Sequence, residues 1–73
     1  MRIKELRKSR KISQIKLGMD LNMSQNTISR YETGVREPSI EDLIRIADYF
    51  NVSVDYLLER TDNPEINRKQ KTL

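Results

Sequence analysis

Apolar residues recur every three or four positions along most of the chain, and this spacing predicts helices. The expected helices span residues 2–10, 14–21, 25–33, 40–50 and 54–60. A serine, a residue favoured at helix N-caps, precedes each of the last four: Ser13, Ser24, Ser39 and Ser53. Residues that tolerate the left-handed conformation follow three of them: Asn22, Gly34 and Asn51. Strand-like alternation is absent from the sequence. We therefore expect an all-α fold, a compact bundle of five short helices.

The helical part of the chain and its C-terminal segment differ in their pattern of apolar residues. The fourth helix has the clearest inward stripe, made of Ile40, Leu43, Ile46, Ala47 and Phe50, and Asp42 stands where a near capping box would place an acid. Residues 61–73 contain Pro64, many polar residues and no periodic stripe. We therefore expect a helical domain over residues 1–60 and a polar, flexible tail over residues 61–73.

Composition narrows the function classes. The chain has 73 residues, enough for one small domain, and 36% of them are hydrophobic, too many for a disordered tail. No apolar run is long enough to cross a membrane or to serve as a signal peptide. Cysteine and histidine are both absent, which removes thiol chemistry, the commonest general base and the commonest metal ligand. We therefore expect that the protein is not an enzyme and that it binds no metal ion and no cofactor.

The charge is unevenly distributed. Lys plus Arg total 14 against 11 acids, a net charge of +3. Residues 1–12 carry six cations and one acid, whereas residues 39–60 carry two cations and five acids. A basic front with an acidic back suggests that one face meets a polyanion. The alternative is that the first helix merely has a solvated polar face.

The most informative stretch is residues 14–34, two helices separated by a three-residue break. This spacing matches a helix-turn-helix, whose second helix enters the major groove of DNA. Gln and Asn can pair with adenine, Arg with guanine, and the Thr methyl group can touch thymine. The candidate base contacts are Gln25, Asn26, Thr27, Ser29 and Arg30. Alternatively, this polar face is only solvated, because the same geometry occurs in bundles that never touch DNA.

Three stretches of the sequence are a stronger signal than the helix-turn-helix spacing alone: IKELRKSRKISQ, SQNTISRYETG and REPSIEDLIRIADYFNVSVDYLL. With them, nearly all of residues 2–60 resembles the phage repressor and Cro-type helix-turn-helix domain, the lambda and P22 repressor fold. The resemblance implies sequence-specific double-stranded DNA binding by a small cytoplasmic transcriptional regulator, with the helix from Gln25 to Thr33 in the major groove. It further implies a repressor that acts as a homodimer on a palindromic operator.

The resemblance also implies roles for single residues. Gln14 matches a glutamine that reaches a phosphate and helps to hold the recognition helix. Arg7 and Glu32 match a buried ion pair between the first helix and the recognition helix. The expected phosphate contacts are Arg10, Ser13, Gln14, Lys16, Ser24 and Arg36. Lys16 is the weakest of them, and a solvated surface lysine is the favoured alternative for it.

The chain departs from the family pattern at three positions. Lys11 replaces a common Gly after the first helix, so either that turn differs or Lys11 adopts a mildly strained conformation. Gly18 replaces an Ala, and we expect Gly18 to allow equally close packing at the cost of lower helix propensity. Lys16 replaces a Glu that would complete a capping box.

The partner surface remains open at this stage. Exposed apolar residues of the last helix are candidates for a dimer surface: Val54, Tyr56 and Leu58. Ordinary packing under that helix is the alternative for Val54. A second function is a protein-interaction or antitoxin-type module with the same fold, which the salt dependence of binding would distinguish. We expect no membrane partner and no small-molecule ligand.

Overall fold

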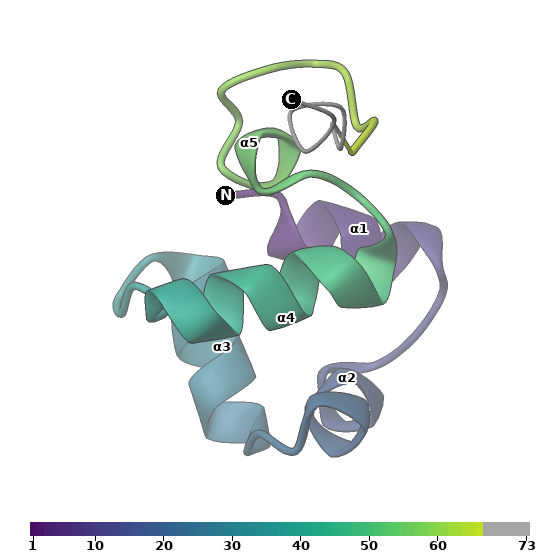
Figure 1. The fold of residues 1–73 in the computed structure, drawn as a ribbon. Coiled ribbons are helices and arrows are strands. Elements are labelled where there is room, and N and C mark those ends of the chain that lie inside the picture. The colour runs from purple at the N-terminus through teal and green to yellow at the C-terminus, as the bar shows by residue number, and fades with distance from the viewer. Residues whose placement is uncertain (67–73) are drawn as a thin grey trace.

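The computed structural model describes residues 1–66, which contain five α-helices and no strand (Figure 1). The helices are α1 (Ile3–Ser9), α2 (Gln14–Leu21), α3 (Gln25–Thr33), α4 (Ile40–Phe50) and α5 (Val54–Leu57). The prediction of an all-α fold is confirmed. Helix α5 is shorter than predicted. It stops at Leu57, and two residues later Glu59 takes a φ of 63°, which turns the chain out of the helix.

Serine caps begin four of these helices. Each serine hydroxyl accepts the backbone N–H three residues further on, with donors Lys16, Thr27, Asp42 and Tyr56 at 3.0–3.1 Å. Helices α2, α3 and α4 are followed by the C-cap residues Asn22, Gly34 and Asn51, whose φ angles are 58°, 80° and 56°. Each cap contributes about 1 kcal/mol to helix stability, so these local signals define the boundaries that were expected.

Every helix contributes to one core. The fully buried side chains Ile3, Leu17, Ile28, Ile46 and Leu57 come from α1 to α5 in that order. Leu21, Tyr31, Ala47, Phe50 and Val52 complete it. Ile40 does not belong to the inward stripe of α4, contrary to expectation. As the first residue of that helix it lies before the turns that pack on the core, and it is 77% exposed.

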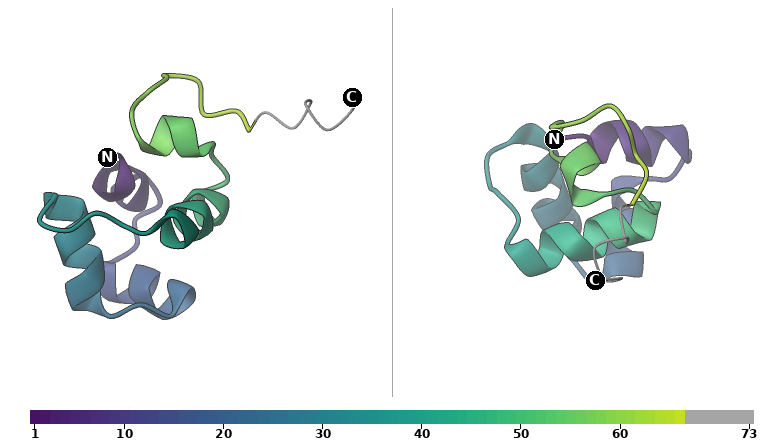
Figure 2. Two further views of the ribbon diagram at one scale, coloured as in Figure 1. Left: turned by 60° about the vertical axis from the view of Figure 1, so that its left-hand side comes forward. Right: turned by 45° about the horizontal axis from the view of Figure 1, so that its top comes forward.

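The helices are arranged so that α2 and α3 share one end of the molecule (Figures 1 and 2). Helix α5 and the loop that follows it, up to residue 66, lie at the opposite end, with α1 and α4 between. Within residues 1–66, none of the helices has both the length and the apolar character required to span a bilayer.

The first part of the expected flexible tail is packed. The carbonyl of Pro64 accepts the N–H of Ser53 at 2.9 Å. The guanidinium of Arg2 donates to the Thr61 carbonyl at 3.2 Å and to the Asp62 carboxylate at 3.1 Å. These contacts join Thr61, Asp62 and Pro64 to the rest of the fold. The rest of the predicted tail, residues 67–73, lies outside the described residues.

Candidate nucleic-acid interface

Helices α2 and α3 approach each other closely at Gly18. The N–H of Met23, in the turn between the helices, donates to the Gly18 carbonyl at 2.8 Å. A Cβ atom on Gly18 would lie 2.4 Å from the Met23 carbonyl oxygen, a distance at which the backbone must shift. Gly18 is therefore buried and allows closer packing than Ala would, which corrects the expectation of equal packing.

The candidate base-contacting residues lie on the side of α3 away from the core. Ile28 and Tyr31 are buried, whereas Gln25, Asn26 and Arg30 are exposed. The side chains of Asn26, Ser29 and Arg30 form no hydrogen bond or ion pair with any residue in the described part of the chain; Ser29 is half-buried. Their polar groups are therefore free to bind an external partner.

The side chains of Ser24 and Thr27 are hydrogen-bonded to each other at the start of α3. Their hydroxyl oxygens are 2.9 Å apart, and the Ser24 hydroxyl also accepts the Thr27 N–H. Thr27 is half-buried. A base contact by Thr27 would thus use its methyl group, while both hydroxyls serve the helix cap.

A chain of polar contacts runs from α1 to the first residue of α3. The Arg7 guanidinium donates through Nε to Glu32 Oε2 at 2.6 Å and through Nη2 to Oε1 at 3.2 Å, and the Glu32 side chain is 2% exposed. Gln14 Nε2 also donates to Glu32, at 3.1 Å, and the Gln14 side-chain oxygen accepts from Gln25 at 3.4 Å. The hydrogen bond to Glu32 raises the pKa of Arg7, so the guanidinium stays charged. The network positions Gln25 relative to the start of α2. The resemblance implied that Gln14 helps to hold the recognition helix, and its contacts with Glu32 and Gln25 join it to α3. Nothing local in the sequence identifies Glu32 as the partner of Gln14.

The remaining cations near this face differ in their partners. Lys16 pairs with Asp20 one turn along α2 at 3.2 Å, and its side chain is 57% exposed. Tyr49 donates to Asp20 at 2.6 Å; this hydrogen bond and the one from Lys16 lower the pKa of Asp20. The charge of Lys16 is thus partly balanced within the fold.

Arg10 lies elsewhere. Its guanidinium donates to the Phe50 carbonyl at 2.8 Å and the Tyr49 carbonyl at 3.3 Å, and it lies 5.3 Å from the centre of the Phe50 ring. A cation at the end of a helix also complements the helix dipole. Arg10 therefore caps the C-terminus of α4, and we no longer count it among the phosphate contacts.

Comparison with known proteins agrees with this geometry. Residues 3–57 match a family model described as helix-turn-helix. The chain belongs to the helix-turn-helix family. Two relatives from Bacillus subtilis (strain 168) match almost the whole chain. The HTH-type transcriptional regulator ImmR is 34% identical over 97% of this chain and 54% of its own length. The SPbeta prophage-derived uncharacterized HTH-type transcriptional regulator YonR is 32% identical over 99% of this chain and 70% of its own length.

The uncharacterized HTH-type transcriptional regulator YobD of the same organism is 31% identical over 99% of this chain. The chain spans 64% of the length of YobD and little more than half that of ImmR. No solved structure matches.

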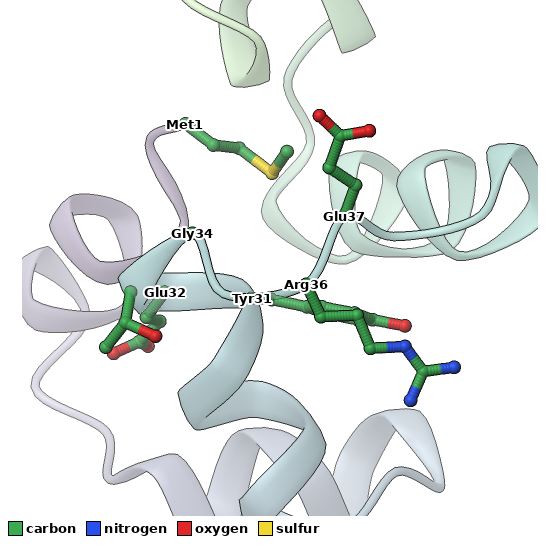
Figure 3. Close-up of a pocket in the computed structure, with 7 residues that line it drawn as sticks. Met1, Tyr31, Glu32, Gly34, Arg36 and Glu37 are labelled. Atoms are coloured by element: carbon green, nitrogen blue, oxygen red, sulfur yellow. The ribbon is translucent and has the colours of Figure 1, made fainter.

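In this helix-turn-helix domain, Arg36 lies in the loop that leaves α3. With Met1, Tyr31 and Glu37 it borders a hollow of about 330 Å³, shown in Figure 3. The Glu32 carboxylate and the Arg36 guanidinium extend to opposite sides of this hollow. Arg36 is exposed and forms no ion pair within residues 1–66, so its charge is available at the end of the recognition helix.

The predicted dimer surface is not an exposed apolar face. Val54, Tyr56 and Leu58 are all half-buried; Val54 and Tyr56 pack against the core, and the Arg2 guanidinium lies 4.3 Å from the centre of the Tyr56 ring. The large apolar residues most exposed among residues 1–66 lie elsewhere: Ile15 and Met19 on α2, Val35 in the loop after α3, and Ile40 and Ile44 on α4.

Proposed function

We propose that this domain binds double-stranded DNA in a sequence-specific manner, as the DNA-binding part of a transcriptional regulator. The observation that carries the proposal is the exposed row on α3, made of Gln25, Asn26 and Arg30, on a helix that the buried Arg7–Glu32 network ties to α1 and α2. A recognition helix fixed in the fold before binding loses less conformational freedom on binding. The relatives named above are transcriptional regulators, and we propose no enzymatic role.

Direct readout would come from the start of α3 in the major groove. Gln25 and Asn26 present amides that match the N6 and N7 atoms of adenine, and Arg30 presents a guanidinium that matches guanine O6 and N7. Ser29 and the Thr27 methyl group would add secondary contacts. Each well-formed bidentate pair discriminates against the wrong base by about 1–3 kcal/mol.

Phosphate contacts would position the domain on the duplex. Ser13 and Gln14 lie at the N-terminus of α2 and Ser24 at that of α3, where free amides and the helix dipole attract anions. Arg36 would bind the backbone beyond the end of α3, and Lys16 would contribute a weaker contact.

We further propose that two copies bind a palindromic operator as a homodimer. Occupying the operator excludes other proteins, so repression needs no surface beyond this interface. Ile40 and Ile44 lie one turn apart on α4 and are 77% and 48% exposed, with Val35 nearby in sequence. They replace the half-buried residues of α5 as the candidate dimer contact. A DNA-binding regulator acts where the chromosome lies, so we expect it in the cytoplasm.

The test is a double substitution, Gln25→Ala with Asn26→Ala, compared with Asn63→Ala at the opposite end of the molecule. We expect the double variant to lose specific binding while its melting temperature stays within about 8 °C of the wild type, since two exposed substitutions together change stability by at most about 1 kcal/mol. The control should bind normally. If the double variant retained its operator preference, α3 would not be the reading element.

A protein-interaction module is the second candidate. The exposed Ile15 and Met19 on α2, 55% and 74% exposed, favour it. A protein partner bound mainly through these residues would show weak salt dependence, whereas phosphate contacts make affinity fall steeply with ionic strength.

A further inference from the structure

The six cations of residues 1–12 divide into two groups in the fold. The three arginines have internal partners: Arg2 on the Tyr56, Thr61 and Asp62 oxygens, Arg7 on Glu32, and Arg10 on the end of α4. The three lysines, Lys4, Lys8 and Lys11, are exposed and form no ion pair with any residue from 1 to 66. The positive charge that the fold leaves uncommitted at this end is therefore a set of lysines.

These lysines are close together along α1. Lys4 and Lys8 are one helical turn apart, and Lys11 follows just after the end of the helix. Like charges at this spacing destabilise a helix. Lys11 has a φ of 58°, a left-handed conformation that is unfavourable for a non-glycine residue. These three lysines, the lysine stripe, thus lower the stability of the free protein. A negatively charged partner would compensate for their mutual repulsion.

The lysine stripe is connected to the candidate nucleic-acid interface through Arg7 and the start of α2. Arg7, which lies between Lys4 and Lys8 in sequence, contacts Glu32 of α3, and its Nη1 donates to the Ile12 carbonyl at 2.9 Å. Lys11 directly precedes Ile12 and Ser13, where α2 begins. Lys11 therefore adjoins the start of α2 in the chain, and Lys4 and Lys8 lie on the helix that contacts the recognition helix through Arg7.

We propose that Lys4, Lys8 and Lys11 bind backbone phosphates of the duplex outside the base pairs that α3 reads. This inference rests on the proposed DNA-binding function and extends the footprint of each domain. A DNA backbone fits better than a protein or a membrane surface. None of the large exposed apolar side chains in residues 1–66 belongs to α1, so the lysines lack the adjoining apolar residues that protein interfaces and amphipathic membrane helices use.

The experiment compares the triple variant Lys4→Gln, Lys8→Gln, Lys11→Gln with the wild type on two duplexes. Both duplexes carry the operator from in-vitro selection; one ends at the operator and the other extends about one helical turn, roughly 10 bp, beyond each side. Each lost phosphate contact lowers the slope of log affinity against log salt by about 0.9, so three contacts are worth roughly 100-fold in affinity near 0.15 M salt. We expect that loss on the long duplex and equal affinities of variant and wild type on the short one.

A single-charge pair provides the matched control. Lys8→Gln and Arg60→Gln each remove one exposed cation, but Arg60 follows α5 at the opposite end and is 74% exposed. Lys8→Gln should weaken binding to the long duplex by about 5-fold, the effect of one phosphate contact, and Arg60→Gln should not. Melting curves check folding, and the triple variant should be at least as stable as the wild type because repulsion is relieved.

Three outcomes would overturn the inference: unchanged affinity of the triple variant for the long duplex, equal losses on both duplexes, or equal effects of Lys8→Gln and Arg60→Gln. Loss of binding to an acidic protein or to anionic vesicles, with unchanged DNA binding, would assign the stripe to that partner instead. A wild-type protein that bound neither duplex would contradict the proposed function itself, a result distinct from these.

Discussion

Glu32 forms hydrogen bonds that join the recognition helix to both α1 and α2. Its carboxylate accepts two hydrogen bonds from Arg7 and one from Gln14, while its side chain is almost completely shielded from solvent. A buried carboxylate is costly unless each charge is paired and hydrogen-bonded, as it is here. The same atoms therefore stabilise the fold and position Gln14, and through it Gln25.

Replacing Glu32 with Ala should lower the free energy of unfolding by about 3–5 kcal/mol, because Arg7 would remain buried without its partner. Urea denaturation measures this. Glu37→Ala, which removes an exposed acid from the following loop, should change stability by less than about 0.5 kcal/mol. Equal effects of the two substitutions would show that the pair contributes nothing beyond surface charge.

The two glycines of the chain serve different physical needs. Gly34 has a φ of 80° and open space around its missing side chain, whereas Gly18 has helical geometry but no room for a methyl group. Gly18→Ala should cost about 1–3 kcal/mol through overpacking, despite the better helix propensity of Ala. Gly34→Ala should cost about 1 kcal/mol through backbone strain, and Gly34→Asn should cost less, because Asn tolerates the left-handed region. A stabilising Gly18→Ala, measured by thermal melting, would contradict the close approach at Met23.

At the scale of elements, one hydrogen bond ties the recognition helix to α4. The Tyr31 hydroxyl donates to the Asp42 carboxylate at 2.8 Å, and Ser39 accepts the Asp42 N–H. The predicted near capping box is therefore only half formed, because the Asp42 carboxylate binds Tyr31 rather than returning to the start of its own helix. Burial and the contact with Asp42 raise the pKa of Tyr31.

This pKa shift predicts an alkaline limit to stability. Because the folded state raises the pKa, the contribution of Tyr31 is complete below the ordinary tyrosine pKa of about 10 and is lost as the pH rises through the raised value. Tyr31→Phe should cost about 1 kcal/mol at neutral pH, and its stability should fall less than that of the wild type above about pH 10. Urea denaturation at pH 7 and pH 11 tests this. Parallel pH profiles for the two proteins would argue against the Tyr31–Asp42 bond.

At the scale of the whole molecule, the sequence predicted what depends on neighbouring residues. Serine caps, left-handed Asn and Gly residues and the apolar spacing placed four of the five helices, and the polar start of α3 identified the candidate reading surface. The features that it missed join distant residues. Arg10 caps a helix whose last carbonyl lies 40 residues away, and Arg2 and Ser53 hold the segment after α5. Local periodicity carries no information about such contacts.

The sequence also could not predict which individual side chains are exposed to solvent. Ile40 fits the inward stripe of α4 by spacing, and Tyr56 resembles a surface residue by position. Only the packing of the other helices decides that Ile40 is exposed and that Tyr56 lies under Arg2. The residues proposed for a dimer surface are therefore less exposed than the sequence suggested, whereas Gln25, Asn26 and Arg30 are exposed on the open face of α3, as expected from the inward spacing of Ile28 and Tyr31.

The measurement that tests the central claim most directly is in-vitro selection of duplexes from a random pool, with binding of the selected sequence measured at two salt concentrations. The proposed function predicts an enriched palindrome whose half-site centres are about 10 bp apart, or a multiple of that, and an affinity that falls steeply with salt. Weak binding without enrichment of any sequence would contradict it, and would direct the search to a protein partner.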